Sequence, residues 1–158
     1  MATATLSGYL AELTACTFSG TQTLASLADN EWSDLSDAIN NSTNKWMMAD
    51  FEIFVDFATT SAAATDNTFE LYIVPSADGG TTYGDWTGNS TSDQQQNNQY
   101  YVGSVTISQS AADETAILRS VALPNGYFKV GVRNRTGGAL DSTPNSTVSY
   151  RPWGYASN

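Results

Sequence analysis

The stretch FEIFVDFA, residues 51–58, decides the fold class of this chain. Large apolar residues occupy every second position from Phe51 to Phe57, and the acids Glu52 and Asp56 lie between them. Successive side chains of a β-strand point to opposite faces of its sheet. The alternation therefore predicts a strand with one face buried in a core and the other in contact with water.

Further short segments of the same character lie along the chain, at 69–74, 100–107, 116–123, 127–134 and 146–151. Turn signals such as Pro75 and the PNG of 124–126 separate them. Residues 23–32 and 33–39 could each be a short strand, or the second a helical turn that begins at Ser33. About seven or eight strands without a long helix predict an all-β fold, an antiparallel sandwich or barrel.

The length of 158 residues indicates a single domain. Residues 1–23 show little periodicity, and we expect an N-terminal arm or irregular lead-in there. Residues 24–158 form the predicted β-sandwich domain. It contains a long polar loop at 76–99 and an aromatic C-terminal tail, and loops of that length are usually functional or mobile.

The residue types exclude most catalytic chemistry. The chain has no histidine, and Cys16 is its one cysteine, so histidine-based acid–base catalysis and thiolate metal sites are excluded. Phosphate-binding glycine motifs do not occur either. We therefore expect neither an enzyme nor a bound cofactor. The single cysteine, with neither a basic leader nor a long apolar run, predicts a soluble protein that folds in a reducing cytoplasm.

The charge is negative overall and unevenly distributed. The net charge of −10 argues against nucleic acid as a partner. Residues 1–118 contain 15 acids and one base, which gives −14, whereas residues 119–158 contain one acid and five bases, which gives +4. Such asymmetry indicates either an interaction surface or a pairing of the basic strands with acidic strands of the same sheet.

Three of the bases form a row on one predicted strand. With period two, Lys129, Arg133 and Arg135 share one face, opposite the apolar face that contains Phe128 and Val130. We call these three residues the basic row. A neighbouring protein could bind it. The acids of other predicted strands that could face it instead are Glu52, Asp56 and Glu70.

The loop at 76–99 offers two further kinds of candidate. Tyr83 and Trp86 lie in polar surroundings, where aromatic rings stack on sugars, cover the end of a sandwich or fill a subunit interface. Weak candidates for oxygen ligands of a cation are Asp78, Asp85 and Asp93. Their spacing does not match an EF-hand, and aspartate and glycine also serve ordinary turns, so we predict no metal site.

Three stretches together resemble one protein family. They are SLADNEWSDLSDAINNSTNKW (26–46), LYIVPSADGGTTYGD (71–85) and LPNGYFKVGVRNRTGGAL (123–140). In this order they are similar to the head decoration, or cement, proteins of tailed bacteriophages, whose fold is a jelly-roll-like β-sandwich. The resemblance covers roughly residues 24–152. This chain has Asn125 where the family more often has a second proline.

The resemblance implies a non-enzymatic virion protein, made in the host cytoplasm, that decorates and stabilises the outer capsid surface. Its implied partner is the major capsid protein, and its implied state on the capsid is a homo-oligomer, without nucleic acid or membrane. The contact residues we would expect are the basic row, Arg151, Trp153 and Tyr155. The alternative is a carbohydrate-binding module on a phage tail, spike or head surface, in which Tyr83 and Trp86 contact the sugar.

Overall fold

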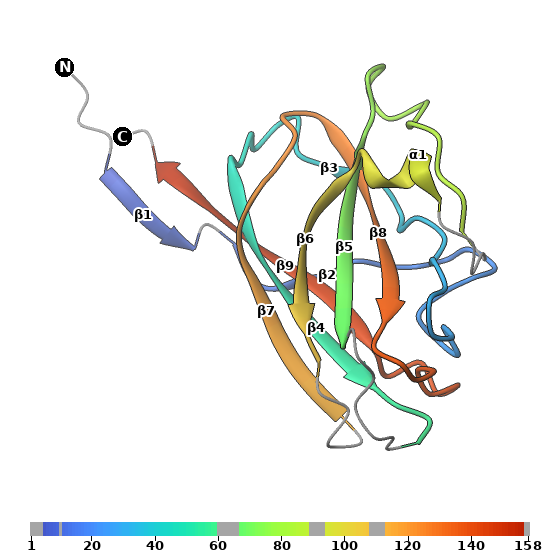
Figure 1. Cartoon of the computed structure of the whole chain (residues 1–158). Coiled ribbons are helices and arrows are strands. Elements are labelled where there is room, and N and C mark those ends of the chain that lie inside the picture. The colour runs from blue at the N-terminus through green and yellow to red at the C-terminus, as the bar shows by residue number, and fades with distance from the viewer. Residues whose placement is uncertain (1–4, 10, 60–66, 89–93, 108–112, 157–158) are drawn as a thin grey trace.

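The computed structural model describes residues 5–9, 11–59, 67–88, 94–107 and 113–156. Two antiparallel sheets pack against each other in this structure (Figure 1). The strands are β1 (Thr5–Tyr9), β2 (Thr14–Ala15), β3 (Ile39–Asn40), β4 (Met48–Asp56), β5 (Thr68–Pro75), β6 (Tyr101–Thr106), β7 (Asp113–Ala122), β8 (Tyr127–Arg135) and β9 (Thr147–Ala156). A single helical turn, α1 (Gln95–Asn98), lies between β5 and β6. No helix among the described residues is long and apolar enough to cross a membrane.

The strand pairing is nested. β2 pairs with β9, β3 with β8, β4 with β7 and β5 with β6, so the chain resembles one long hairpin. Two further pairings, β4 with β9 and β5 with β8, divide this hairpin between two sheets. The strand orders become β1-β9-β4-β7, with β2 also on β9, and β3-β8-β5-β6. This arrangement is that of a double-sheet jelly roll, which confirms the predicted fold class.

The core lies between the inner faces of the two sheets. Phe51, Ile53 and Val55 of β4 are completely buried, which confirms the alternation in FEIFVDFA. Phe128 and Val130 of β8 are equally buried and face them from the other sheet. Truncation of a buried phenylalanine to alanine costs about 3–5 kcal/mol, so these positions hold the two sheets together.

The two ends of the chain contain more strand than the sequence predicts. β1 and β2 lie in the expected lead-in, and both pair with β9. β9 itself continues through Pro152, where the sequence predicts the start of a tail. Pro152 lies opposite Ala49 of β4. On its other edge, β9 has no described partner at Pro152, because β2 pairs only as far as Tyr150 and β1 only from Trp153. Proline is tolerated at such edge positions of a sheet.

Beyond Trp153, β9 pairs with β1 but no longer with β4. These two strand segments, Thr5–Tyr9 and 153–156, form a two-stranded ribbon that projects from the sandwich, with the start of β1 and the end of β9 at its far end (Figure 1). We call it the terminal ribbon.

Residues 23–38 form neither of the short strands nor the helical turn considered from the sequence. They run as an irregular segment along the edge of β8, with one bridge at Trp32. The backbone N–H groups of Ser33 and Ser36 donate to the carbonyls of Val132 and Val130, at 3.0 and 2.8 Å. In return, the N–H groups of Val130 and Val132 donate to the hydroxyls of Ser36 and Ser33, at 2.9 and 3.1 Å. Serine side chains thus take the place of a strand at this edge.

Candidate functional site

The expected contact residues lie on two opposite faces of the sandwich. The basic row lies on the outer face of β8, in the β3-β8-β5-β6 sheet. Arg151 and Trp153 lie on β9, in the other sheet, one and three residues beyond the inward-facing Tyr150. The side chain of Tyr155 is outside the described part of the structure. No single flat surface therefore contains the whole predicted set.

Aromatic rings cover the outer face of β8. The Nζ atom of Lys129 lies 4.9 Å from the centre of the Tyr83 ring, and the Cζ atom of Arg133 lies 4.8 Å from the centre of the Trp32 ring. Between them, the Trp86 ring lies directly against Gly131. We call Trp32, Tyr83 and Trp86 the aromatic cover. These contacts attach Tyr83 and Trp86 of the 76–99 loop, and Trp32 of the 23–38 segment, to the sheet.

Trp32 is the member of this cover that the sequence does not reveal. It is completely buried, and its ring centre lies 4.8 Å from that of Tyr72 and 5.4 Å from that of Trp86. The indole N–H of Trp86 donates to the carbonyl of Ser33 at 2.9 Å, which joins the loop to the irregular edge segment. Tyr83 and Trp86, considered above as sugar contacts or as a cover of the sandwich, thus pack against the protein's own sheet.

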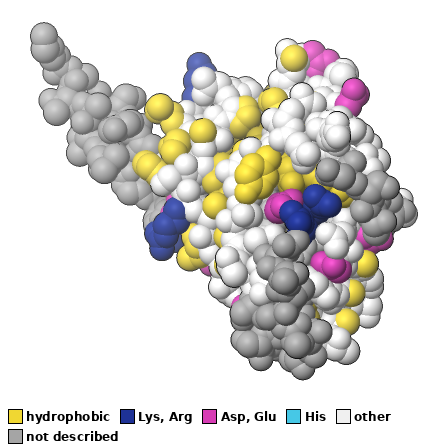
Figure 2. Space-filling view, viewed as in Figure 1, with side chains coloured by type: hydrophobic (Ala, Val, Ile, Leu, Met, Phe, Trp, Pro, Cys, Tyr) yellow, Lys and Arg dark blue, Asp and Glu magenta, His cyan; other side chains and the backbone are white. Residues whose placement is uncertain are grey.

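Glu70 of β5 is the acid that faces the basic row. Its Oε1 atom lies 3.3 Å from Nη1 of Arg135, and its Oε2 atom lies 4.0 Å from Nη1 of Arg133. The side chains of Glu70 and Arg133 are only 13% and 12% exposed. Glu52 and Asp56 lie on β4, in the other sheet. Figure 2 shows acidic and basic side chains in contact on the face seen there, beside a hydrophobic patch.

Tyr72, two residues beyond Glu70 on β5, completes this cluster. Its hydroxyl donates to Oε2 of Glu70 at 2.6 Å. Burial, together with this hydrogen bond and the charge of Glu70, raises the pKa of Tyr72 far above its ordinary value. The phenol therefore remains a proton donor, and it holds the carboxylate in position between the two guanidinium groups.

The outer face of the β9-β4-β7 part of the other sheet is organised by Asp50. Its Oδ1 atom accepts the indole N–H of Trp153 at 3.2 Å and the backbone N–H of Ser120 at 2.9 Å. Its Oδ2 atom lies 3.8 Å from Nη1 of Arg119, and Arg151 is its register partner on β9. Ser120 has a positive φ of 59° beside an irregularity of the β4–β7 register, and this turn of the backbone brings its N–H to Asp50.

A shallow hollow of about 90 Å³ lies on this face. Its lining residues are Leu13, Asp50, Glu52, Ile117 and Arg151. Ile117 is 47% and Leu13 38% exposed, so apolar and charged groups meet water side by side. We call the lining residues together with Trp153 the open face. Such a mixture of apolar, arginine and tryptophan side chains is typical of protein–protein contact surfaces.

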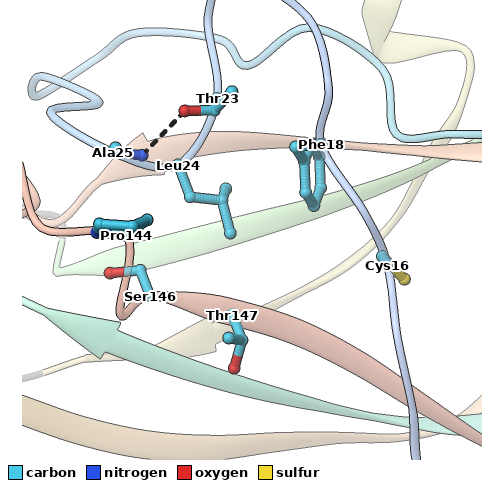
Figure 3. Close-up of a pocket in the computed structure, with 8 residues that line it drawn as sticks. All are labelled: Cys16, Phe18, Thr23, Leu24, Ala25, Pro144, Ser146 and Thr147. Atoms are coloured by element: carbon cyan, nitrogen blue, oxygen red, sulfur yellow. Dashed lines mark hydrogen bonds between the residues drawn. The ribbon is translucent and has the colours of Figure 1, made fainter.

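A second cavity, of about 200 Å³, lies between the N-terminal segment and the residues before β9 (Figure 3). Its lining residues are Cys16, Phe18, Thr23, Leu24, Ala25, Pro144, Ser146 and Thr147. Burial raises the pKa of the Cys16 thiol to about 12, so the thiol stays protonated near neutral pH and is a poor nucleophile. The lining contains neither an acid nor a base that could activate it.

An open groove of about 440 Å³ lies where β6 approaches the end of β7. Its lining residues are Ile73, Pro75, Gln99, Tyr100, Tyr101, Val102, Ala122, Leu123 and Pro124. Tyr101 is 48% exposed, and its ring is supported by Tyr72, with the two ring centres 5.5 Å apart. The groove therefore presents rings, proline surfaces and one amide, without a charged side chain.

Within the described residues, the aspartates considered as cation ligands are not gathered into a site. The carboxylate of Asp78 accepts the N–H groups of Thr81 and Thr82 and the hydroxyl of Ser76, so it stabilises its own loop. These hydrogen bonds, led by that from the backbone of Thr82, lower the pKa of Asp78 to about 2. Asp93 lies outside the described residues. Within the described part of the chain, no three acids, cysteines or histidines are close enough to hold a metal ion.

The candidate surfaces differ in what they can still bind. Tyr83, Trp32 and Glu70 contact the three residues of the basic row, whereas the open face and the uncharged groove present accessible side chains. The sequence matches no protein-family model and no curated protein.

Proposed function

We propose that this chain is a structural protein of a tailed-bacteriophage virion that decorates the outer capsid surface and bridges subunits of the major capsid protein. The observation that carries the proposal is the difference between the two outer faces of the sandwich. One is covered by the protein's own loop and edge segment, and the other presents the open face. The jelly-roll pairing agrees with the fold of the decoration proteins that the sequence resembles.

The open face is the part of the protein that we assign to the shell. Arg151 and Trp153, both expected at the contact from the sequence, belong to it, and Ile117 and Leu13 add exposed apolar area. Tryptophan and arginine are the residue types that contribute most to binding when they lie near the centre of an interface. We assign the basic row a structural role within the fold, because Glu70, Trp32 and Tyr83 already bind it there.

Virion composition gives the first test of this function. Purified virions of the phage that encodes the chain should contain it in a fixed ratio to the major capsid protein, measured by quantitative mass spectrometry. Absence from purified virions would rule out the proposed function.

Sedimentation with purified heads that lack the protein gives the second test. We expect Ile117→Ser to weaken binding at least about tenfold, as truncation of a central contact does. Tyr101→Ser is the matched control, because Tyr101 is 48% exposed against 47% for Ile117 and lies in the other sheet. Equal binding by wild type and Ile117→Ser would refute the assignment of the open face.

A second candidate function, the binding of a neutral carbohydrate, is favoured by the uncharged groove. The exposed Tyr101 ring is held by Tyr72 and offers a stacking surface beside the amide of Gln99. In this candidate function, the sugar contacts Tyr101 instead of Tyr83 and Trp86. A glycan array would then show binding that Tyr101→Ser abolishes and Ile117→Ser leaves intact, and an array without any bound glycan would remove the candidate.

A further inference from the structure

The terminal ribbon differs from the rest of the molecule in charge. The first charged residue of the chain is Glu12, and the last is Arg151. Both strands of the ribbon beyond the sandwich are therefore uncharged, in a protein with a net charge of −10. The ribbon also projects from the sandwich, so its far end is held apart from the acidic surface of its own body (Figure 1).

The ribbon has an edge that is suited to pairing. β1 contributes five residues, and on the side away from β9 no described strand pairs with them. A two-stranded ribbon is only marginally stable in water by itself. Natural proteins usually protect such edges with charges, prolines or covering segments. β8 has that protection from Ser33 and Ser36, and β7 carries Asp113, Glu114 and Arg119.

We propose that two copies of this chain associate through β1, antiparallel and about a two-fold axis near Ser7, the middle residue of that strand. The result is a continuous sheet in the order β9-β1-β1-β9 across the two copies. An antiparallel pair of identical strands satisfies two-fold symmetry, the commonest symmetry of homo-oligomers. Backbone hydrogen bonds along the new pairing stabilise both ribbons.

The charge distribution favours a second copy of this chain as the partner of the β1 edge. Two bodies of −10 repel each other, and their contact is favourable only where no acids meet and the bodies remain far apart. The terminal ribbon meets both conditions. The inference goes beyond the proposed capsid role and does not depend on it, since the association takes place between free copies in solution.

Sedimentation equilibrium of the full chain tests this association. We expect wild type to reach twice its chain mass of 16.9 kDa, and to associate more tightly as salt screens the repulsion between bodies. Ser7→Glu and Ser7→Lys should each raise the dimer dissociation constant at least about tenfold, because like charges would then lie opposite each other. An equal mixture of the two variants should recover the dimer, because opposite charges then meet.

The matched controls are Thr43→Glu and Thr43→Lys, at an exposed position in the turn before β4. They should dimerise as wild type does. Wild type that remains at 16.9 kDa at every concentration overturns the proposal. Unchanged association of both Ser7 variants, or a mixture that stays monomeric, overturns it equally. Capsid binding is tested separately at Ile117, so failure of one proposal is distinguishable from failure of the other.

Discussion

Trp86 lies so close to Gly131 that a Cβ atom at residue 131 would overlap three atoms of the indole ring. Because Gly131 has no side chain, the Trp86 ring can lie on the sheet between Lys129 and Arg133. Gly131 is itself buried under this ring. Trp86 of the loop and Gly131 of the strand are 45 positions apart in sequence, and their shapes fit each other.

Gly131→Ala should displace Trp86 and lower the free energy of unfolding by about 1–3 kcal/mol, as overpacking of a filled site does. Urea unfolding measures the loss, and a shift of tryptophan fluorescence reports the displaced ring. Gly126→Ala is the control, because a Cβ at residue 126 meets no atom within 4 Å. Equal stability of both variants would contradict the close fit.

Glu70→Gln should destabilise the fold by about 2 kcal/mol, because Arg133 and Arg135 then lose the negative charge of this carboxylate, at a site where the Glu70 side chain is only 13% exposed. The variant also changes the acceptor of the Tyr72 hydroxyl. Glu52→Gln on the open face is the control and should have little effect. Urea unfolding of both variants at pH 7 makes the comparison, and a loss of equal size in the control would contradict the special role of Glu70.

Removal of the hydroxyl from Ser36 should cost about 1–3 kcal/mol, because Ser36→Ala leaves the buried N–H of Val130 without its acceptor. Ser33→Ala should act in the same way on the N–H of Val132. Ser142→Ala, at an exposed position, is the control. Amide hydrogen exchange adds a local readout: Val130 and Val132 should exchange faster in the matching variant, and unchanged protection would argue against the hydroxyl bonds.

Stability should fall as pH rises above 9, because burial raises the pKa of Cys16 from 9.0 to about 12 in the folded protein. The unfolded thiol loses its proton first, so this contribution is complete below pH 9 and is lost as pH rises toward 12. The slope reaches about 1.4 kcal/mol per pH unit. Cys16→Ala should reduce the slope between pH 9 and 10, and an identical slope in the variant would contradict the buried thiol.

The strands that could be predicted from the sequence are those with one buried face. In β4, β5 and β8 the apolar residues alternate because the core lies on one side, and Phe51, Leu71 and Val130 carry that signal. β1 shows no such alternation. The strand character of β9 continues past Pro152 because the neighbouring strands, rather than the local sequence, determine its pairing.

The candidate sites were predictable to a similar extent. The basic row followed from period two, and Glu70 was one of three acids considered for it. Trp32 could not be assigned, since it belongs to a segment held by serine hydroxyls and single backbone bonds, which leave no period in the sequence. Only part of the open face could be predicted from the sequence, because Leu13, Ile117 and Arg151 come together from three separate parts of the chain.

The nested pairing of the strands also predicts the order in which the strands pair during folding. β5 and β6 are neighbours in the chain and can meet early, whereas β2 and β9 are separated by more than a hundred residues. Contacts between distant parts of a chain form slowly, in milliseconds to seconds for sandwiches of this kind. β9 lies between β4 and the N-terminal strands, so a nascent chain leaves that sheet unfinished until β9 has been synthesised.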